Sequence, residues 1–319
     1  MSQVDIAEPR KRLFIMVTGA TGGVGRATVS RLVDAGHFVF AAGRRESALE
    51  AFAAGRPEIH TIALDVTDRS SVDHAMDQVQ ATTRGHGLDV LVNAAGILVL
   101  GPVEAVPDEQ ARRQFDVNLF GLLAVTRAFV PPMRERRSGR IVNVSSVLGR
   151  FALPGSGLYS ASKFAVEAVS DALRMELAPF GVRVVLVEPG VIDTPLYDSA
   201  AASLPIYDEA LDPYRAAWPA GFGFPARLMR AAASPASAGA LLAKAALARN
   251  PRERYRSGLR NRLNIRLLTA LPTGVTDKIK TRIAGVARSP GPAPLGRTGS
   301  GSERAGDVEA GAPGNHPAS

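Results

Sequence analysis

Two residues whose spacing could support proton transfer stand near the start of the segment LYSASKFAVEAVSDALRMEL, which begins at Leu158. Tyr159 and Lys163 are four residues apart, so a helix would place both side chains on one face. A phenol titrates near pH 10 and transfers protons poorly at neutral pH unless a nearby cation favours its anion. The pair could therefore be a general acid/base. Taken alone, such a pair is usually a surface contact in which the lysine stem lies along the ring.

The same segment must also pack against a core if it is to hold these groups in place. Its apolar residues recur at helical spacing, and a buried face is expected at Phe164, Val166, Val169, Leu173 and Leu177.

Composition excludes several kinds of chemistry. The chain has 319 residues, 46% of them hydrophobic, which suffices for one large α/β domain with an appendage or for two small domains. It has no cysteine, which excludes disulfides, thiolate nucleophiles and cysteine metal sites. The five histidines lack ligand spacing, so no metal site is predicted. No apolar run approaches the roughly 20 residues that span a bilayer, and we expect a cytoplasmic protein.

Short β-branched apolar runs alternate with amphipathic segments of helical length. The expected strands are Leu13–Thr18, Phe38–Ala42, Ile59–Leu64, Val90–Val92, Arg140–Ser145 and Arg183–Glu188. The expected helices are Arg26–Ala35, Ser70–Arg84, Asp108–Arg136, Tyr159–Phe180 and Ser237–Arg249. Strands that are apolar on both faces and alternate with helices predict an α/β fold, a Rossmann-type doubly wound parallel sheet with helices on both faces.

The first expected strand runs into a glycine-rich loop, TGATGGVG, and then into a helix. Glycines let the backbone turn tightly and approach a pyrophosphate at the helix N-terminus. Residue 28 is a threonine, so the GxGxxG pattern is not met, but the position of the loop predicts a dinucleotide site. Its expected contacts are Gly19, Thr21, Gly23, Val24 and Gly25.

The second expected strand ends in AAGRRE, where many dinucleotide sites place an acid on the adenosine ribose. Here Gly43 takes that place and is followed by Arg44 and Arg45. Arginines suit a 2′-phosphate, so NADP(H) is the expected cofactor and NAD(H) the alternative. The competing interpretation is two solvated arginines in a loop.

Further motifs arrive in a fixed order with fitting gaps: NAAG at Asn93–Gly96, NLFG at Asn118–Gly121, IVNVSSVLG at Ile141–Gly149, YSASK at Tyr159–Lys163 and EPG at Glu188–Gly190. With the glycine loop, they make the chain resemble the short-chain dehydrogenase/reductase family in its compact, YxxxK-bearing branch. The resemblance covers about residues 12–195. The later segment NPRERYRSGLRNRLNIRLLTALP resembles the extension of hydroxysteroid- and retinol-dehydrogenase-like members.

The resemblance implies catalytic roles. Tyr159 would exchange a proton with the substrate oxygen, and Lys163 would lower the pKa of Tyr159 and hold the nicotinamide ribose. Ser146 would donate a hydrogen bond to the substrate oxygen, with Ser145 as the less favoured choice. Asn118 would anchor a water in a proton relay.

The resemblance also implies cofactor contacts. Asp65 would approach the adenine, Asn93 would pack beside the cofactor, and Thr194 would reach the carboxamide of the nicotinamide. The remaining cofactor contacts expected are Val66, Ala94, Gly96, Tyr159, Lys163, Pro189, Gly190 and Val191.

These features give an expected domain plan. Residues 1–11 would be a flexible N-terminus, and residues 12–250 the NAD(P)-binding catalytic domain with a substrate loop at 191–235. Residues 251–288 would be a basic helical extension. Residues 289–319, dominated by Gly, Pro, Ser and Ala, would be a disordered tail.

The apolar substrate loop favours a hydrophobic alcohol or ketone as substrate, so the expected function is an NADP(H)-dependent alcohol/ketone oxidoreductase. Two alternatives stay open: a dinucleotide-binding sensor or scaffold without turnover, and a 3-oxoacyl-type ketoreductase. The resemblance further implies a homodimer or homotetramer, formed through the helices that carry Asn118 and Tyr159–Lys163.

The basic excess is concentrated in residues 249–288, which hold eleven Lys or Arg against Glu253 and Asp277, a net +9 in a chain of net +8. Leu259, Leu263, Leu267 and Leu271 recur there every four residues. The segment could be an amphipathic helix that touches an anionic membrane or nucleic acid. The favoured interpretation is a helix whose leucines pack on the enzyme and whose arginines are solvated, without a nucleic-acid partner or a membrane contact.

Overall fold

The computed structural model of the chain describes residues 12–218 and 229–286, except for the side chains of residues 259–262 and 264. The segments expected to be flexible or disordered, residues 1–11 and 289–319, lie outside the described residues, and those expectations stay predictions.

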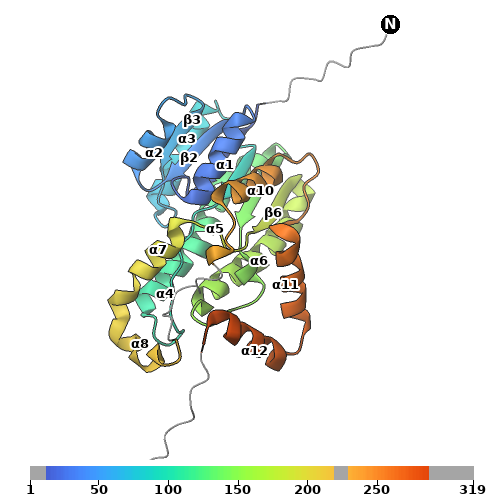
Figure 1. Ribbon diagram of the computed structural model, residues 1–319. Helices are drawn as coiled ribbons and strands as arrows, with labels where there is room; N and C mark the ends of the chain where they lie inside the picture. The colour runs from blue at the N-terminus through green and yellow to red at the C-terminus, as the bar shows by residue number, and fades with distance from the viewer. Residues whose placement is uncertain (1–11, 219–228, 287–319) are drawn as a thin grey trace, which may run out of the picture. The chain divides into compact units, whose positions relative to one another are not determined.

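A single sheet of parallel strands forms the centre of the described chain, in the order β3-β2-β1-β4-β5-β6-β7 (Figure 1). The strands are β1 (Phe14–Thr18), β2 (Phe38–Gly43), β3 (Ile59–Ala63), β4 (Val90–Asn93), β5 (Gly139–Val144), β6 (Val182–Glu188) and β7 (Arg254–Arg256). This order reverses beside β1, between β1 and β4, as in a doubly wound dinucleotide-binding fold. The predicted Rossmann-type sheet is confirmed.

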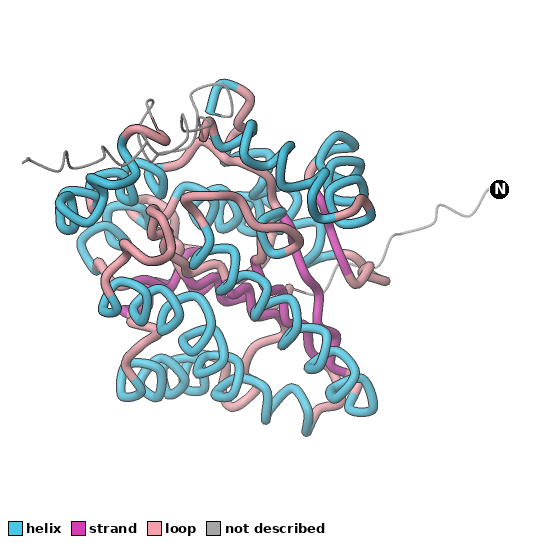
Figure 2. The backbone as a smooth tube through the Cα atoms, turned by 90° about the horizontal axis from the view of Figure 1, so that it is seen from below, coloured by secondary structure: helices cyan, strands magenta, loops and turns pink. Residues whose placement is uncertain are grey.

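Successive residues of the central strands enter two different cores because side chains alternate across a sheet. In β1, Ile15 and Val17 join the core on one face, and Met16 joins the core on the other; all are fully buried. Helices therefore cover both faces, and Figure 2 shows the strands running between them.

One face of the sheet is covered by α1, α2 and α10, and the other by α3, α5 and α6. The helices are α1 (Gly23–Asp34), α2 (Glu46–Ala53), α3 (Arg69–Thr82), α4 (Asp108–Phe115), α5 (Leu122–Glu135), α6 (Gly157–Leu177), α7 (Pro195–Ala202), α8 (Asp208–Arg215), α10 (Pro235–Leu247), α11 (Gly258–Ala270) and α12 (Thr273–Ala284). None of the described helices is both long and apolar enough to cross a membrane.

The predicted helix over residues 108–136 is not one regular α-helix. A π-helical segment, Asp116–Gly121, separates α4 from α5. The amphipathic pattern continues through this segment, which is why the sequence predicted a single helix. π-Helical turns are rare and frequently mark functional sites, and this one contains Asn118.

The C-terminal extension differs from its prediction at its start. Residues 254–256 form β7, which pairs in parallel with β6 and buries Tyr255 in the core. Two helices, α11 and α12, then follow as expected.

The predicted leucine stripe of this extension is not its buried face. Leu263 and Leu267 are 64% and 49% exposed, whereas Ile265 and Leu268 are buried. The four-residue spacing of the leucines marks one side of α11. The side that packs inward is a neighbouring one, which carries Ile265 and Leu268.

One residue of α6 also departs from its predicted position. Phe164 is 44% exposed, while Val166 and Leu177 are buried as expected. The inward face of this helix includes Lys163 and Glu167. Because polar side chains occupy part of the buried face, hydrophobicity alone misplaced Phe164.

Candidate active site

The glycine-rich loop brings backbone close to backbone where side chains would not fit. Gly19 has a φ of +66°, and a Cβ there would lie 2.8 Å from the Ala95 Cα. A Cβ at Gly25 would lie 2.2 Å from the Gly19 carbonyl oxygen. Because these glycines have no side chains, the loop packs tightly at the N-terminus of α1, where a pyrophosphate can accept hydrogen bonds from backbone N–H groups. This geometry fits an NAD(P) cofactor.

The loop after β6 lies close to the glycine loop. A Cβ at Gly23 would lie 2.9 Å from Cγ2 of Thr194, the residue that precedes α7. The same loop is fixed to the segments that follow β5 and β7, because the Val147 N–H donates to the Pro189 carbonyl and the Gly190 N–H donates to Ser257 Oγ, each at 2.9 Å. The predicted contacts at residues 189–194 and in the glycine loop thus face one region.

The end of β2 is open and positively charged. Arg44 and Arg45 are exposed, and neither forms an ion pair with any of the described residues. Gly43 lies beside Thr21: a Cβ there would stand 3.6 Å from the threonine side chain, an ordinary contact distance. The two arginines are thus available to an anionic ligand at this edge.

Asp65 and Val66 follow β3 next to this region. Partial burial opposes ionisation of Asp65, but hydrogen bonds from Thr67 and the charges of Arg44 and Arg113 lower its pKa. Val66 is buried, and a Cβ at Gly121 of the π-helical segment would lie 2.5 Å from it. Asp65 is therefore a charged group close to Arg44, at the predicted adenine end.

The NAAG segment is held by a residue that the sequence did not single out. Thr18 Oγ1 accepts hydrogen bonds from the backbone N–H groups of Ala94 and Ala95, both at 3.0 Å. The amide of Asn93 points into the sheet, where Nδ2 donates to Thr126 Oγ1 and Asn143 Oδ1 at 3.0 Å. Asn93 therefore fixes the strand ends. The position of Thr18 at the C-terminal end of β1 was the available signal, because ligands of such sheets bind there.

Asn118 connects the π-helical segment to both the NAAG loop and α6. Its Oδ1 accepts from the Ile97 N–H at 2.8 Å, and its Nδ2 donates to the Ile97 carbonyl at 3.0 Å and to Ser162 Oγ at 3.1 Å. A Cβ at Gly96 would lie 3.3 Å from Asn118 Oδ1 and 3.8 Å from Lys163 Nζ. Asn118 and Lys163 therefore border the same small space.

Ser146, Tyr159 and Lys163 converge beside that space. Ser146 Oγ accepts from the Leu148 N–H at 3.1 Å, which leaves its hydroxyl proton available. Lys163 Nζ donates to the Val144 carbonyl at 2.9 Å and lies 5.8 Å from the centre of the Tyr159 ring. The structure therefore brings the serine at the end of β5 together with the tyrosine and lysine of α6.

Burial is the main influence on the pKa values of Tyr159 and Lys163. Tyr159 keeps part of its surface exposed, yet desolvation by the surrounding protein and the nearby Tyr197 raise its pKa, while Ser146 lowers it. Burial also lowers the pKa of Lys163 to about 8, and the charge of Glu167 opposes that shift. The lowering of the tyrosine pKa by Lys163 that the resemblance implies stays a prediction.

An apolar wall stands against Tyr159. Leu98 and Leu100 pack with Leu196 and Tyr197 of α7, and Tyr159 joins the same cluster. The Tyr207 hydroxyl donates to the Leu100 carbonyl and ties the 3₁₀ turn Leu204–Tyr207 to this wall. Figure 1 shows α7 and α8 beside α4. The described part of the predicted substrate loop is thus largely helical.

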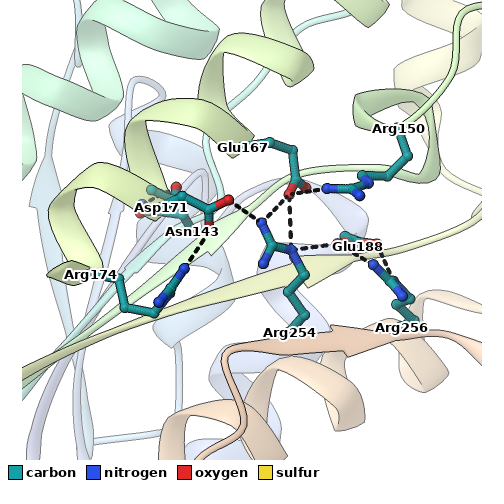
Figure 3. Close-up of polar contacts among 9 residues, drawn as sticks. Asn143, Arg150, Glu167, Asp171, Arg174, Glu188, Arg254 and Arg256 are labelled. Carbon is teal, nitrogen blue, oxygen red and sulfur yellow. Dashed lines mark hydrogen bonds and ion pairs between the residues drawn. The ribbon is translucent and has the colours of Figure 1, made fainter.

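A second group that the sequence missed lies on α6 beyond the lysine. Glu167 and Asp171 contact Arg254 of β7, which also contacts Glu188 at the end of β6 (Figure 3). The clue in the sequence was that Tyr159, Lys163, Glu167 and Asp171 recur every four residues.

Comparison with known proteins agrees with this geometry. Residues 13–204 match the family model described as short chain dehydrogenase. The chain is 36% identical over 192 residues to an NADPH-dependent 3-dehydrocapnine reductase from Ornithobacterium rhinotracheale, covering 59% of this chain and 68% of that protein. It is 34% identical over 287 residues to human retinol dehydrogenase 5, covering 86% and 89%.

A solved structure gives the same result. The crystal structure of a short-chain dehydrogenase from Streptomyces avermitilis superposes with a TM-score of 0.66 at 32% identity, covering 86% of this chain and 95% of that one. The chain belongs to the short-chain dehydrogenase/reductase family, in its retinol-dehydrogenase-like part, and is an oxidoreductase that acts on CH–OH groups with NAD(P).

Proposed function

We propose that the protein is an NADP(H)-dependent oxidoreductase that interconverts a hydrophobic alcohol with its ketone or aldehyde. The observation that supports this most directly is the convergence of Ser146, Tyr159 and Lys163 beside the apolar wall formed by Leu98, Leu100 and α7. A phenol, a hydroxyl and an ammonium at one point can bind and protonate an oxygen atom, and the wall can exclude water from it.

In the direction of reduction, the residues act on the substrate oxygen. Ser146 donates a hydrogen bond to that oxygen with the proton that its contact to Leu148 leaves free. Tyr159 transfers its phenolic proton to the same oxygen, and its raised pKa keeps the proton in place until then. The hydride would come from NADPH when that cofactor is bound. In the opposite direction, the tyrosine accepts the proton.

Lys163 has two tasks in this proposal. Its ammonium has further donors beyond the one given to the Val144 carbonyl, and these can hold the ribose hydroxyls of the cofactor. Its charge also stabilises the tyrosinate that forms when the proton leaves. Asn118, which shares the space bordered by Gly96, is placed to anchor a water between Lys163 and solvent.

The cofactor would lie across the glycine loop. Gly19, Gly23 and Gly25 leave room for its pyrophosphate, Asp65 and Val66 adjoin its adenine, and residues 189–194 adjoin its nicotinamide. The free arginines at the end of β2 support NADP(H), since Arg44 can meet the 2′-phosphate. The NADPH-dependent relative is consistent with this preference.

The proposed substrate is hydrophobic because the wall beside Tyr159 is apolar. Tyr197 is also largely desolvated, which raises its pKa to about 12, so it lines the wall as a neutral ring. A sensor or scaffold would not require the assembled Ser146–Tyr159–Lys163 set, and a 3-oxoacyl-type ketoreductase remains the competing enzyme hypothesis.

A homodimer or homotetramer is proposed as the assembly. Phe164 and Met175 lie eleven residues apart on α6, on one helix face, and are 44% and 65% exposed; Phe120 of the π-helical segment is 57% exposed. Exposed apolar residues on these helices are the kind that a partner surface covers.

The function can be tested with the purified full-length protein. NADPH oxidation is followed at the cofactor's absorbance with a panel of long-chain, cyclic and polar ketones. Turnover of the apolar members is expected, and it is expected to vanish in Tyr159→Phe. Selective turnover of an acyl-carrier thioester would instead support the 3-oxoacyl hypothesis, and cofactor binding without any turnover would support the sensor.

A further inference from the structure

C-terminal to the candidate catalytic pair, a row of polar side chains continues along one face of α6. Tyr159, Lys163, Glu167 and Asp171 recur every four residues, and both Lys163 and Glu167 are 5% exposed. Residues four apart face each other on a helix. Glu167 therefore lies one helical turn beyond Lys163, and among the described residues its carboxylate pairs with arginines, not with the lysine ammonium.

Glu167 is held by cations from two other segments. Nε and Nη2 of Arg254, in β7, each lie 3.3 Å from its Oε2, and Nη1 of Arg150 lies 3.8 Å from the same oxygen (Figure 3). Arg150 follows the 3₁₀ turn Val147–Gly149 that Ser146 caps. That turn packs on Glu167, because a Cβ at Gly149 would lie 3.1 Å from Glu167 Cγ.

The same arginine joins Glu167 to the loop that follows β6. Arg254 contacts Asp171 Oδ2 at 2.6 Å and Glu188 Oε1 at 3.2 Å. Arg256 contacts Glu188 Oε2 at 2.5 Å. Glu188 is fully buried and directly precedes Pro189. β7 therefore ties α6 to the segment proposed to adjoin the nicotinamide.

The cations oppose the cost of burying Glu167. Burial raises the pKa of its carboxyl, and the neighbouring Glu188 adds to the rise, whereas Ser145, Arg254 and Arg150 lower it. Neither the Ser145 hydroxyl nor Glu167 Oε1 has a hydrogen-bond partner among the described residues. In the weakly screened interior of a protein, a carboxylate that contacts cations through one oxygen still interacts electrostatically with another nearby charge.

We propose that Glu167 is a positioning residue for Lys163: its carboxylate, fixed by Arg254 of β7 and by Arg150, favours the charged form of the buried lysine one helical turn away, whose ammonium the Val144 carbonyl holds near Tyr159. This inference rests on the proposed function for its catalytic meaning, but the electrostatic pairing can be measured without turnover.

The sign of the effect follows from the surrounding charges. The groups that face this pair come from α6, the turn after Ser146, β6, β7 and α7: Tyr159, Asp171, Arg150, Glu188, Arg254 and Tyr197. Neutralising Glu167 removes an opposite charge one turn from Lys163, so burial lowers the lysine pKa further from its value of about 8.

The first measurement is an NMR titration of lysine side chains in the full-length protein. The chain has five lysines, and Lys163→Arg identifies the signal of Lys163. In Glu167→Gln, the midpoint of that signal is expected to fall by about one pH unit. Asp171→Asn is the matched control: it removes the same charge from Arg254 but lies two turns from the lysine, and a much smaller shift is expected.

The variant is expected to fold because Arg254 retains Asp171 and Glu188. If Glu167→Gln does not fold, Glu167→Met removes the same charge with an apolar side chain of similar length, and the same shift is expected. A Lys163 midpoint that matches wild type in either folded variant, or that moves as far in Asp171→Asn, would overturn the proposal.

The second measurement is the pH dependence of ketone reduction. The alkaline limb of kcat/KM is expected to move to lower pH in Glu167→Gln, and Glu167→Asp, which keeps the charge, is expected to restore it. A uniform loss of activity without movement of the limb would show a merely structural role. If wild-type protein reduces no ketone, the proposed function fails, while the lysine titration still decides this inference.

Discussion

The choice of cofactor at the end of β2 can be reversed by two substitutions, Gly43→Asp with Arg44→Ala. The fold permits both changes. A Cβ at Gly43 would stand 3.6 Å from the Thr21 side chain and 3.7 Å from Leu49, which are ordinary contacts. Arg44 is exposed and forms no ion pair with the described residues, so its removal leaves no carboxylate without a salt bridge.

The magnitude follows from the number of charged contacts that change. A hydrogen bond to a charged group contributes about 1.5–3 kcal/mol, which corresponds to roughly 10- to 150-fold in affinity. Arg44→Ala is therefore expected to weaken NADPH binding by about that factor and to leave NADH binding nearly unchanged. An aspartate at residue 43 would add repulsion toward the 2′-phosphate and could accept hydrogen bonds from the ribose hydroxyls of NADH.

The assay is the dissociation constant of each reduced cofactor, measured by nucleotide fluorescence at two ionic strengths. Arg45→Ala is the matched control, because it removes the adjacent exposed arginine and is expected to have the smaller effect. The NADPH advantage of wild type should shrink at high salt, since an exposed contact is screened. Wild-type protein that binds NADH as tightly as NADPH would refute the reasoning, and the arginines would then be solvated side chains.

The other predictions concern the catalytic residues, the ion-pair network and the assembly. Tyr159→Phe is expected to lower turnover by about 100- to 10,000-fold with nearly unchanged cofactor affinity; retention of a tenth of the activity would contradict its role. Arg254→Met breaks buried pairs, which costs about 3–5 kcal/mol; because Glu188 keeps Arg256 and Asp171 keeps Arg174, the lower end is expected, roughly 6–12 °C in Tm by calorimetry. Burial raises the pKa of Glu167. The stability lost in Arg254→Met should be largest at pH values where the Glu167 carboxyl is ionised and should shrink as pH falls. A loss of stability that is independent of pH would argue against a charge effect. Met175→Glu, far along α6 from Tyr159, is expected to dissociate the oligomer in light scattering, and a monomeric wild type would refute the proposed assembly.

Much of the sheet could be predicted because each central strand is buried on both faces. β1 and β2 contribute residues to both cores, so their sequences are continuously apolar and bounded by polar turns. β7 lacks this signal: it is three residues long, and Tyr255 is the buried member between two arginines. A strand held by ion pairs to residues far away in the sequence leaves no apolar run to detect.

The candidate site was predictable where chemistry restricts the residue type. The glycines are required by backbone contact, and the serine, tyrosine and lysine by proton transfer, so type and order together located them. Thr18 was not predicted as a site residue. It accepts hydrogen bonds from two backbone N–H groups of the NAAG loop, and this role depends on β1 and β4 being neighbours in the sheet. The rotation of α11 escaped because its buried side depends on contacts that the helix's own pattern does not contain.

The C-terminal charge shows how the fold changes the meaning of composition. Residues 249–288 carry all of the basic excess, and an anionic surface was one of the two interpretations of that charge. Arg254 and Arg256, however, reach inward to carboxylates on α6 and β6, one of them fully buried. These arginines are counter-ions for acids that lie beside the candidate site, so part of the excess has an internal cause. If Glu167 has the proposed role, the extension also bears on catalysis: a change that removed β7 would take away Arg254, which lowers the pKa of Glu167, and through Glu167 would act on Lys163.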